Sequence, residues 1–157
     1  MNRLRSEALL RTPESNPNQN ASYRITIFED NDGDVMLLRE ALNAAGIDSE
    51  VRVFSDGEAA LCYIEGGSSV PHIIIMDMHL PKADGIAILQ AVRRSPVLSE
   101  VPVVVLSSSV SSPEVELLRS YGIAEYIMKP SDLDEFMAIG VTVRNLLDPT
   151  IPLARSP

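Results

Sequence analysis

Cysteine and histidine are scarce in this sequence, and their scarcity excludes several kinds of site. The 157 residues contain one cysteine, Cys62, and two histidines, His72 and His79. A single cysteine cannot form an intramolecular disulfide, and no Cys and His residues follow the spacing of a zinc site. Cys62 is therefore expected to be a small core residue.

Basic residues and long apolar segments are also few. Thirteen Lys and Arg residues stand against 22 Asp and Glu, which gives a net charge of −9 and a sequence pI near 4.6. An acidic chain is a poor partner for nucleic acid or for an anionic membrane surface. No apolar run is long enough to span a bilayer, and the N-terminus lacks the apolar segment of a secretory signal. These absences predict a cytoplasmic protein without a disulfide.

The remaining composition is typical of one globular domain. Apolar residues make up 45% of the chain and charged residues 22%, and the length fits one domain. Residues 1–20 contain four Asn and two Pro and are expected to be a flexible N-terminal arm. Residues 149–157 are rich in proline and read as a C-terminal tail, which leaves 21–148 as the folded domain.

Apolar runs and helical patterns alternate along that domain. The predicted strands are Tyr23–Phe28, Glu50–Phe54, His72–Met76, Val101–Leu106 and Glu125–Met128. The predicted helices are Asp34–Ala45, Asp56–Glu65, Asp84–Arg94, Glu114–Tyr121 and Asp132–Leu147. Strands that alternate with helices require right-handed crossovers and a parallel sheet. The fold class is therefore α/β, with a doubly wound five-stranded parallel sheet.

Polar side chains stand where these strands end, and ligands bind at that edge of such sheets. Glu29 and Asp30 follow the first strand, Asp77 the third, Ser107 the fourth and Lys129 the fifth. Carboxylates crowded together favour a bound cation, and Mg²⁺ suits a few carboxylates that leave waters in place. An aspartate beside such a cation and a lysine can accept a phosphoryl group.

Asp32 and Asp34 follow the first acidic pair, and each is interpreted as a cap of the next helix.

Four sequence motifs in order resemble those of bacterial response-regulator receiver domains. They are Phe28-Glu29-Asp30, Met76–Gly85, Leu106-Ser107-Ser108 and Tyr126–Pro130. The resemblance covers about Tyr23 to Leu147 and implies the flavodoxin-like receiver fold. The Glu-Asp-Asn opening and the Val-Pro-Val-Val-Val-Leu-Ser strand further resemble single-domain regulators that are paired with bacterial phytochrome histidine kinases.

This resemblance implies a role for each site residue. Asp77 would accept the phosphoryl group from a kinase phosphohistidine, and Lys129 would contact that group. Ser107 would be the switch hydroxyl, and Tyr126 the aromatic residue that turns inward when Ser107 moves toward the phosphate.

The resemblance also implies a metal site. Asp30, Asp77 and the backbone carbonyl of His79 would bind Mg²⁺, and Glu29 would act through a bound water. Glu29 stands where the family more often has Asp, and a contact through water should tolerate the extra methylene.

These features predict a stand-alone phospho-acceptor signalling domain without a DNA-binding output domain, and not an enzyme with a turnover substrate. Two alternatives stay open: a phosphorylation-independent adaptor with the same fold, and a phosphatase of the haloacid-dehalogenase type. The second is disfavoured because such enzymes need another Asp two residues after the nucleophile, where this chain has His79.

The last helix predicts a homodimer, because its apolar surface exceeds what one buried face requires. The expected core stripe is Leu133, Phe136, Gly140, Val143 and Leu147, and the additional apolar residues are Met137, Val141 and Leu146. The C-terminal tail would take part in this interface.

Overall fold

The structure is a computed structural model that describes residues 22–67, 69–109 and 111–148. The strands are β1 (Tyr23–Phe28), β2 (Ser49–Phe54), β3 (Ile73–Asp77), β4 (Val103–Ser107) and β5 (Glu125–Met128). The helices are α1 (Asp32–Ala44), α2 (Gly57–Gly66), α3 (Gly85–Arg94), α4 (Ser112–Ser120) and α5 (Leu133–Leu147). The predicted arm over 1–20 and tail over 149–157 lie outside the described residues.

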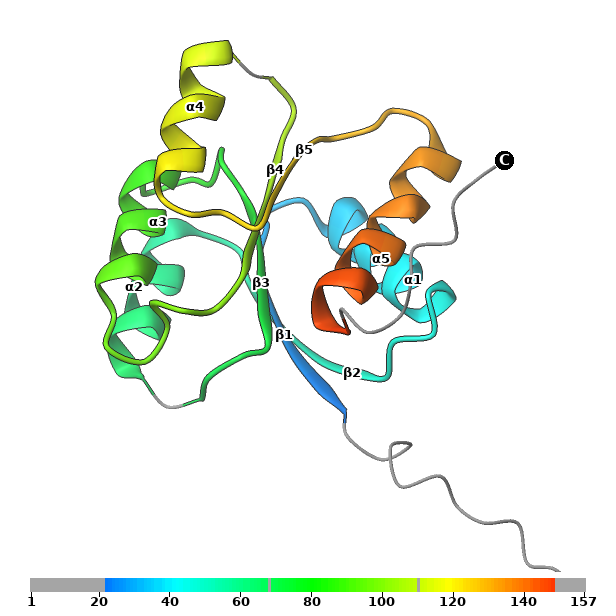
Figure 1. Cartoon of the computed structure of the whole chain (residues 1–157), viewed down its shortest axis with the longest axis horizontal. Coiled ribbons are helices and arrows are strands. Elements are labelled where there is room, and N and C mark those ends of the chain that lie inside the picture. Colours follow the sequence, from blue (N-terminus) through cyan, green and yellow to red (C-terminus); the bar gives the residue numbers. More distant parts are fainter. Residues whose placement is uncertain (1–21, 68, 110, 149–157) are drawn as a thin grey trace, which may run out of the picture.

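The five strands form one parallel sheet in the order β2-β1-β3-β4-β5, which confirms the doubly wound prediction (Figure 1). In the register of β1 and β3, Phe28 lies beside Met76. Connections from β1 and from β3 leave toward opposite edges of the sheet, so a crevice opens between the carboxyl ends of these two strands. Acidic residues stand at both strand ends, and this crevice is where they meet.

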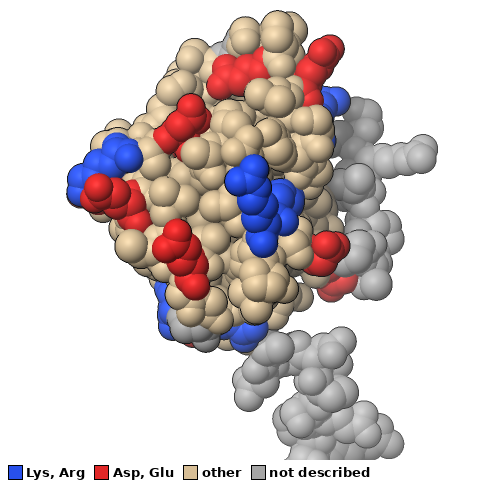
Figure 2. Space-filling view, turned by 90° about the vertical axis from the view of Figure 1, so that its left-hand side faces the viewer, with Lys and Arg blue, Asp and Glu red and all other residues tan. Residues whose placement is uncertain are grey.

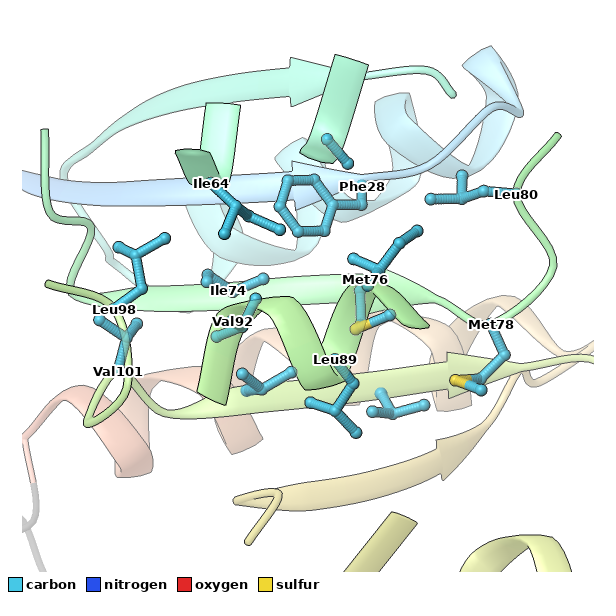
Figure 3. Packing of buried hydrophobic residues seen from close by; sticks show 14 of the residues in the cluster. Phe28, Ile64, Ile74, Met76, Met78, Leu80, Leu89, Val92, Leu98 and Val101 are labelled. Atoms are coloured by element: carbon cyan, nitrogen blue, oxygen red, sulfur yellow. The ribbon is translucent and has the colours of Figure 1, made fainter. Parts of the chain in front are cut away.

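Helices cover both faces of the sheet, α1 and α5 on one side and α2, α3 and α4 on the other (Figure 1). Side chains of β3 alternate between two apolar clusters, with Ile74 and Met76 in one and Ile73 and Ile75 in the other. Figure 3 shows the first cluster, to which β1 contributes Phe28 and α3 contributes Leu89, on the face of the sheet that α3 covers. Strands buried on both faces need the uninterrupted apolar runs that β3 and β4 have.

Helices α1 and α5 pack very closely at Gly140. A Cβ atom added to Gly140 would collide with the backbone carbonyl of Ala41 in α1. Glycine therefore sets the distance between these helices, which fixes α1 against the sheet. Among the described residues, no helix is long and apolar enough to cross a membrane.

Two expectations about individual residues and one about the start of a strand were wrong. Cys62 is exposed on α2 and is not a core residue. Leu133 is 59% exposed, since the first turn of α5 precedes the segment that packs on the sheet and the buried stripe begins at Phe136. Strand β4 begins at Val103, two residues later than predicted, because the Val101 N–H donates to the Leu98 carbonyl in a preceding turn.

Candidate functional site: an acidic cluster and a buried lysine

The carboxyl ends of β1 and β3 bring three acidic residues together. Glu29 and Asp77 are buried, with 2% and 5% exposure, and Asp30 is exposed. One carboxylate oxygen from each of the three lies within 4.8 Å of the others. Since hard divalent cations prefer such oxygen ligands, the three side chains form a set that can hold a divalent cation such as Mg²⁺. The predicted convergence of these carboxylates is confirmed.

Lys129 reaches the same cluster from the end of β5. Its backbone N–H donates to the Ser107 carbonyl at 2.8 Å, which extends the pairing of β5 with β4. Its Nζ then lies 2.6 Å from Asp77 Oδ2, 2.7 Å from Glu29 Oε2 and 2.8 Å from Asp34 Oδ2. An ammonium group has three N–H donors, so the three carboxylates use all of them.

Burial and neighbouring charges shift the pKa values of Glu29 and Lys129 in opposite directions. Burial raises the pKa of the Glu29 carboxyl above its ordinary value, although Lys129 and the N–H of Asn31 oppose this effect. Burial alone would lower the pKa of the Lys129 ammonium, but hydrogen bonds to Asp34, Asp77 and Glu29 outweigh it and raise that pKa. Lys129 therefore stays charged at neutral pH, and it compensates the carboxylates around it.

The loop after β3 holds Asp77 from the other side. The backbone N–H of His79 donates to Asp77 Oδ1 at 2.8 Å, and the exposed imidazole Nδ1 lies 3.8 Å from the same oxygen. Both oxygens of Asp77 therefore accept a hydrogen bond, one from the loop and one from Lys129. The role of the His79 carbonyl as a metal ligand stays a prediction.

The same loop is supported by the start of α2. Lys82 adopts a left-handed φ of 71°, and its Nζ lies 2.9 Å from Asp56 Oδ2, the N-cap residue of α2. The Gly57 N–H donates to the Pro81 carbonyl at 2.8 Å. A Cβ atom added to Gly57 would collide with Ala83. These contacts fix the conformation of the segment that follows Asp77.

Ser107 and Tyr126 lie together at the ends of β4 and β5. The Ser107 side chain is fully buried, and its Oγ donates to the Ser109 carbonyl at 2.7 Å. The Tyr126 hydroxyl is buried near the Ser107 side chain. It makes no hydrogen bond of good geometry to any residue in the described segments. Burial raises the pKa of this phenol. The hydroxyl therefore lies below the surface in this structure, and the switch role of Ser107 and Tyr126 stays a prediction.

Asp34 is the site residue that sequence reasoning missed. It does not cap α1, because Asn31 is the N-cap and its side chain accepts the Asp34 N–H at 3.0 Å. Asp32 lies in the same first turn of α1 and is exposed. The available signal was the position of Asp34 one helical turn beyond an acidic strand end, where a side chain can reach back over the crevice.

A doubly wound sheet with buried acids and a lysine at this crevice defines the receiver class of signalling domains. The sequence profile of the response regulator receiver domain matches residues 25–139. The chain therefore belongs to the response regulator receiver family. Membership of this family makes it a signalling domain and not an enzyme that turns over a free substrate.

Relatives of known name cover most of the chain. Response regulator Rcp1 of Synechocystis sp. is 31% identical over 148 residues, which are 90% of this chain and 98% of that protein. The probable methanogenesis regulatory protein FilR2 of Methanothrix harundinacea is 33% identical over 117 residues, which are 72% of this chain and 76% of that protein.

Solved structures give the same result. The phosphorylated cyanobacterial phytochrome response regulator RcpA has a TM-score of 0.75 and 30% identity, covering 85% of this chain and 99% of that one. The Mn²⁺-bound form of Rcp1 has a TM-score of 0.73 and 28% identity, covering 83% of this chain and 98% of that one.

Proposed function

We propose that this protein is a response regulator whose Asp77 accepts a phosphoryl group from a sensor histidine kinase in a Mg²⁺-dependent reaction. The observation that carries the proposal is the buried Asp77 carboxylate beside Glu29 and Asp30, with the Lys129 ammonium 2.6 Å away. This arrangement combines a nucleophile, a cation site and a fixed positive charge, the elements that phosphoryl transfer requires.

In the proposed step, one Asp77 oxygen attacks the phosphorus atom of the kinase phosphohistidine. A P–O bond forms and the P–N bond breaks, and the imidazole keeps the electron pair and takes up a proton. Lys129 neutralises one phosphoryl oxygen, and the His79 N–H holds the carboxylate in place. A bound Mg²⁺ would offset the remaining negative charge of the carboxylates and the phosphoryl oxygens.

The proposed metal ligands are Asp30, Asp77 and the His79 carbonyl, with Glu29 acting through a water. The acidic cluster supports the carboxylate part of this set. The Mn²⁺-bound form of Rcp1 is a metal complex of a 28% identical receiver, which supports a divalent cation in this chain.

The proposed switch links Ser107 to Tyr126. A phosphoryl group on Asp77 attracts the Ser107 hydroxyl, which then leaves the Ser109 carbonyl that it contacts at 2.7 Å. The freed carbonyl is a new acceptor, and the Tyr126 hydroxyl, which lacks a well-formed hydrogen bond within the described residues, is a new donor. We infer that this exchange changes the surface formed by α4, β5 and α5.

We further propose a phytochrome-type histidine kinase as the upstream partner, which would place the protein in the cytoplasm. RcpA is a phytochrome response regulator and is 30% identical, and a response regulator in red-light signalling of R. palustris is 25% identical with a TM-score of 0.70. On the face seen in Figure 2, basic side chains form small groups with acidic ones between them, which fits a protein partner better than nucleic acid.

We propose a homodimer through α5. Leu133 and Val141 are 59% and 43% exposed, and with Met137 they are spaced four residues apart along one side of the helix. Sedimentation at micromolar concentration should give a dimer for the wild type and a monomer for Val141→Lys. Val97→Lys is the matched control, because Val97 is a valine with the same 43% exposure and lies outside α5. A wild-type monomer with and without beryllofluoride would refute this part.

Acetyl phosphate tests the phosphorylation itself. Wild type, Asp77→Asn and Asp84→Asn would be incubated with and without Mg²⁺ and separated on a phosphate-affinity gel. Asp84→Asn is the control, since Asp84 caps α3 in the same loop and Asn can also cap a helix. A shifted band that requires Mg²⁺ and Asp77 supports the proposal. No shift in the wild type would favour the phosphorylation-independent adaptor.

A further inference from the structure

Lys129 has a third carboxylate partner that differs from the other two. Glu29 and Asp77 belong to the acidic cluster that fits a metal ion, together with Asp30. Asp34 does not belong to that cluster, yet its Oδ2 lies 2.8 Å from Lys129 Nζ. Its side chain is 25% exposed, compared with 12% for Lys129, so it covers the ammonium from the solvent side of the crevice.

The position of Asp34 is fixed by α1. Its backbone N–H is held at 3.0 Å by the Asn31 side chain, which caps the helix. A carboxylate in the first turn of a helix is stabilised by the unpaired N–H groups and the dipole of that end. Helix α1 is in turn held against α5 by the close approach at Gly140. Asp34 is therefore a rigid anchor for a long and flexible side chain.

We propose that Asp34 is a positioning residue that keeps the Lys129 ammonium at the acceptor carboxylate throughout phosphoryl transfer. The inference rests on the proposed function. Glu29 and Asp77 are two of the three hydrogen-bond partners of Lys129. A cation and a phosphoryl group bound at the cluster would compete with Lys129 for the oxygens of these two residues. Asp34 is then the partner that remains, and without it the ammonium regains much of its rotational freedom.

Phosphorylation rates with acetyl phosphate test this role in the full chain. Asp34→Asn should lower the rate of phosphorylation about tenfold, because a neutral amide oxygen replaces the charged carboxylate that holds the ammonium. Asp32→Asn is the matched control, because it removes the same charge from the same exposed turn without touching Lys129. Removing negative charge alone should leave the rate equal or raise it, since the phosphate donor is an anion. The sign of the difference therefore separates positioning from general electrostatics.

The lysine side chain itself gives a second readout. The chain has two lysines, Lys82 and Lys129, so ¹⁵N-lysine labelling yields two ammonium signals, and Lys82→Arg assigns them. In the wild type, the Lys129 signal should persist after Mg²⁺ and beryllofluoride are added, because Asp34 still slows its hydrogen exchange. In Asp34→Asn it should broaden or disappear under the same conditions, while the Lys82 signal and the backbone spectrum stay unchanged.

Two results would overturn the inference. If Asp34→Asn is phosphorylated as fast as Asp32→Asn, then Asp34 has no role in phosphoryl transfer, and the proposed function stays intact. An unchanged Lys129 signal in Asp34→Asn with beryllofluoride would show that other groups hold the ammonium. A wild type that does not load at all would instead overturn the proposed function, and this inference with it.

Discussion

Replacing Lys129 with methionine removes one charge and keeps most of the aliphatic stem. The Lys129 Nζ lies within 2.8 Å of three carboxylates, and the Lys129 side chain is 12% exposed. Glu29 and Asp77 are nearly fully buried, so the variant leaves two buried carboxylates without their cation. We therefore expect Lys129→Met to destabilise the metal-free protein strongly.

The magnitude follows from the burial of the partners. Removing one member of a buried ion pair costs about 3–5 kcal/mol. Asp34 is 25% exposed, so we expect the lower end, about 3 kcal/mol. With a slope of roughly 1.5–2 kcal/mol per M urea, the unfolding midpoint should fall by about 1.5–2 M.

Urea unfolding at pH 7 with EDTA measures this loss, and a second series with Mg²⁺ measures its recovery. Mg²⁺ should stabilise Lys129→Met more than the wild type, because it replaces the missing positive charge. Lys82→Met is the control, since it removes the other lysine from an exposed ion pair with Asp56 and should change stability far less. A Lys129→Met protein as stable as the wild type in EDTA would refute the idea that Lys129 compensates these carboxylates.

Two further pairs of variants test the switch and the loop. Tyr126→Phe should raise the free energy of unfolding by about 1 kcal/mol, because it removes a buried hydroxyl that lacks a well-formed hydrogen bond within the described residues. Tyr63→Phe should lower it by a similar amount, since that hydroxyl donates to a backbone carbonyl at 2.9 Å; equal effects of the two variants in urea would contradict this assignment. Gly57→Ala should weaken Mg²⁺ binding in calorimetry by displacing the loop after β3, whereas Gly66→Ala, which meets no atom within 4 Å, should not. Unchanged binding in Gly57→Ala would show that this loop does not shape the metal site.

Much of the fold and the centre of the site could be predicted from local patterns. The run Ile73-Ile74-Ile75-Met76 matches a strand buried on both faces, and the structure places it in the middle of the sheet. A parallel sheet then brings every strand end to one edge, so the meeting of Glu29, Asp77 and Lys129 follows from strand order alone. These features depend on periodicity and topology, which a single sequence reveals.

The features that were missed depend on contacts between distant segments. The residues around Asp34 predict a helix cap, and its partner Lys129 is 95 residues away in the sequence. Its role becomes visible when the orientation of α1 over the crevice is known. The exposure of Leu133 likewise depends on where the sheet stops covering α5, and helical spacing alone does not show this. The burial of the Tyr126 hydroxyl depends on the side-chain rotamer, which no sequence pattern specifies.

Borohydride trapping after acetyl phosphate treatment tests the central claim most directly. Reduction converts an aspartyl phosphate into a stable product that peptide mass spectrometry locates to one residue. The account predicts that this product forms with Mg²⁺ at position 77 and at no other acidic residue of the site. Trapping at Asp30 or Asp34, or none in a protein that binds Mg²⁺, would contradict Asp77 as the phospho-acceptor.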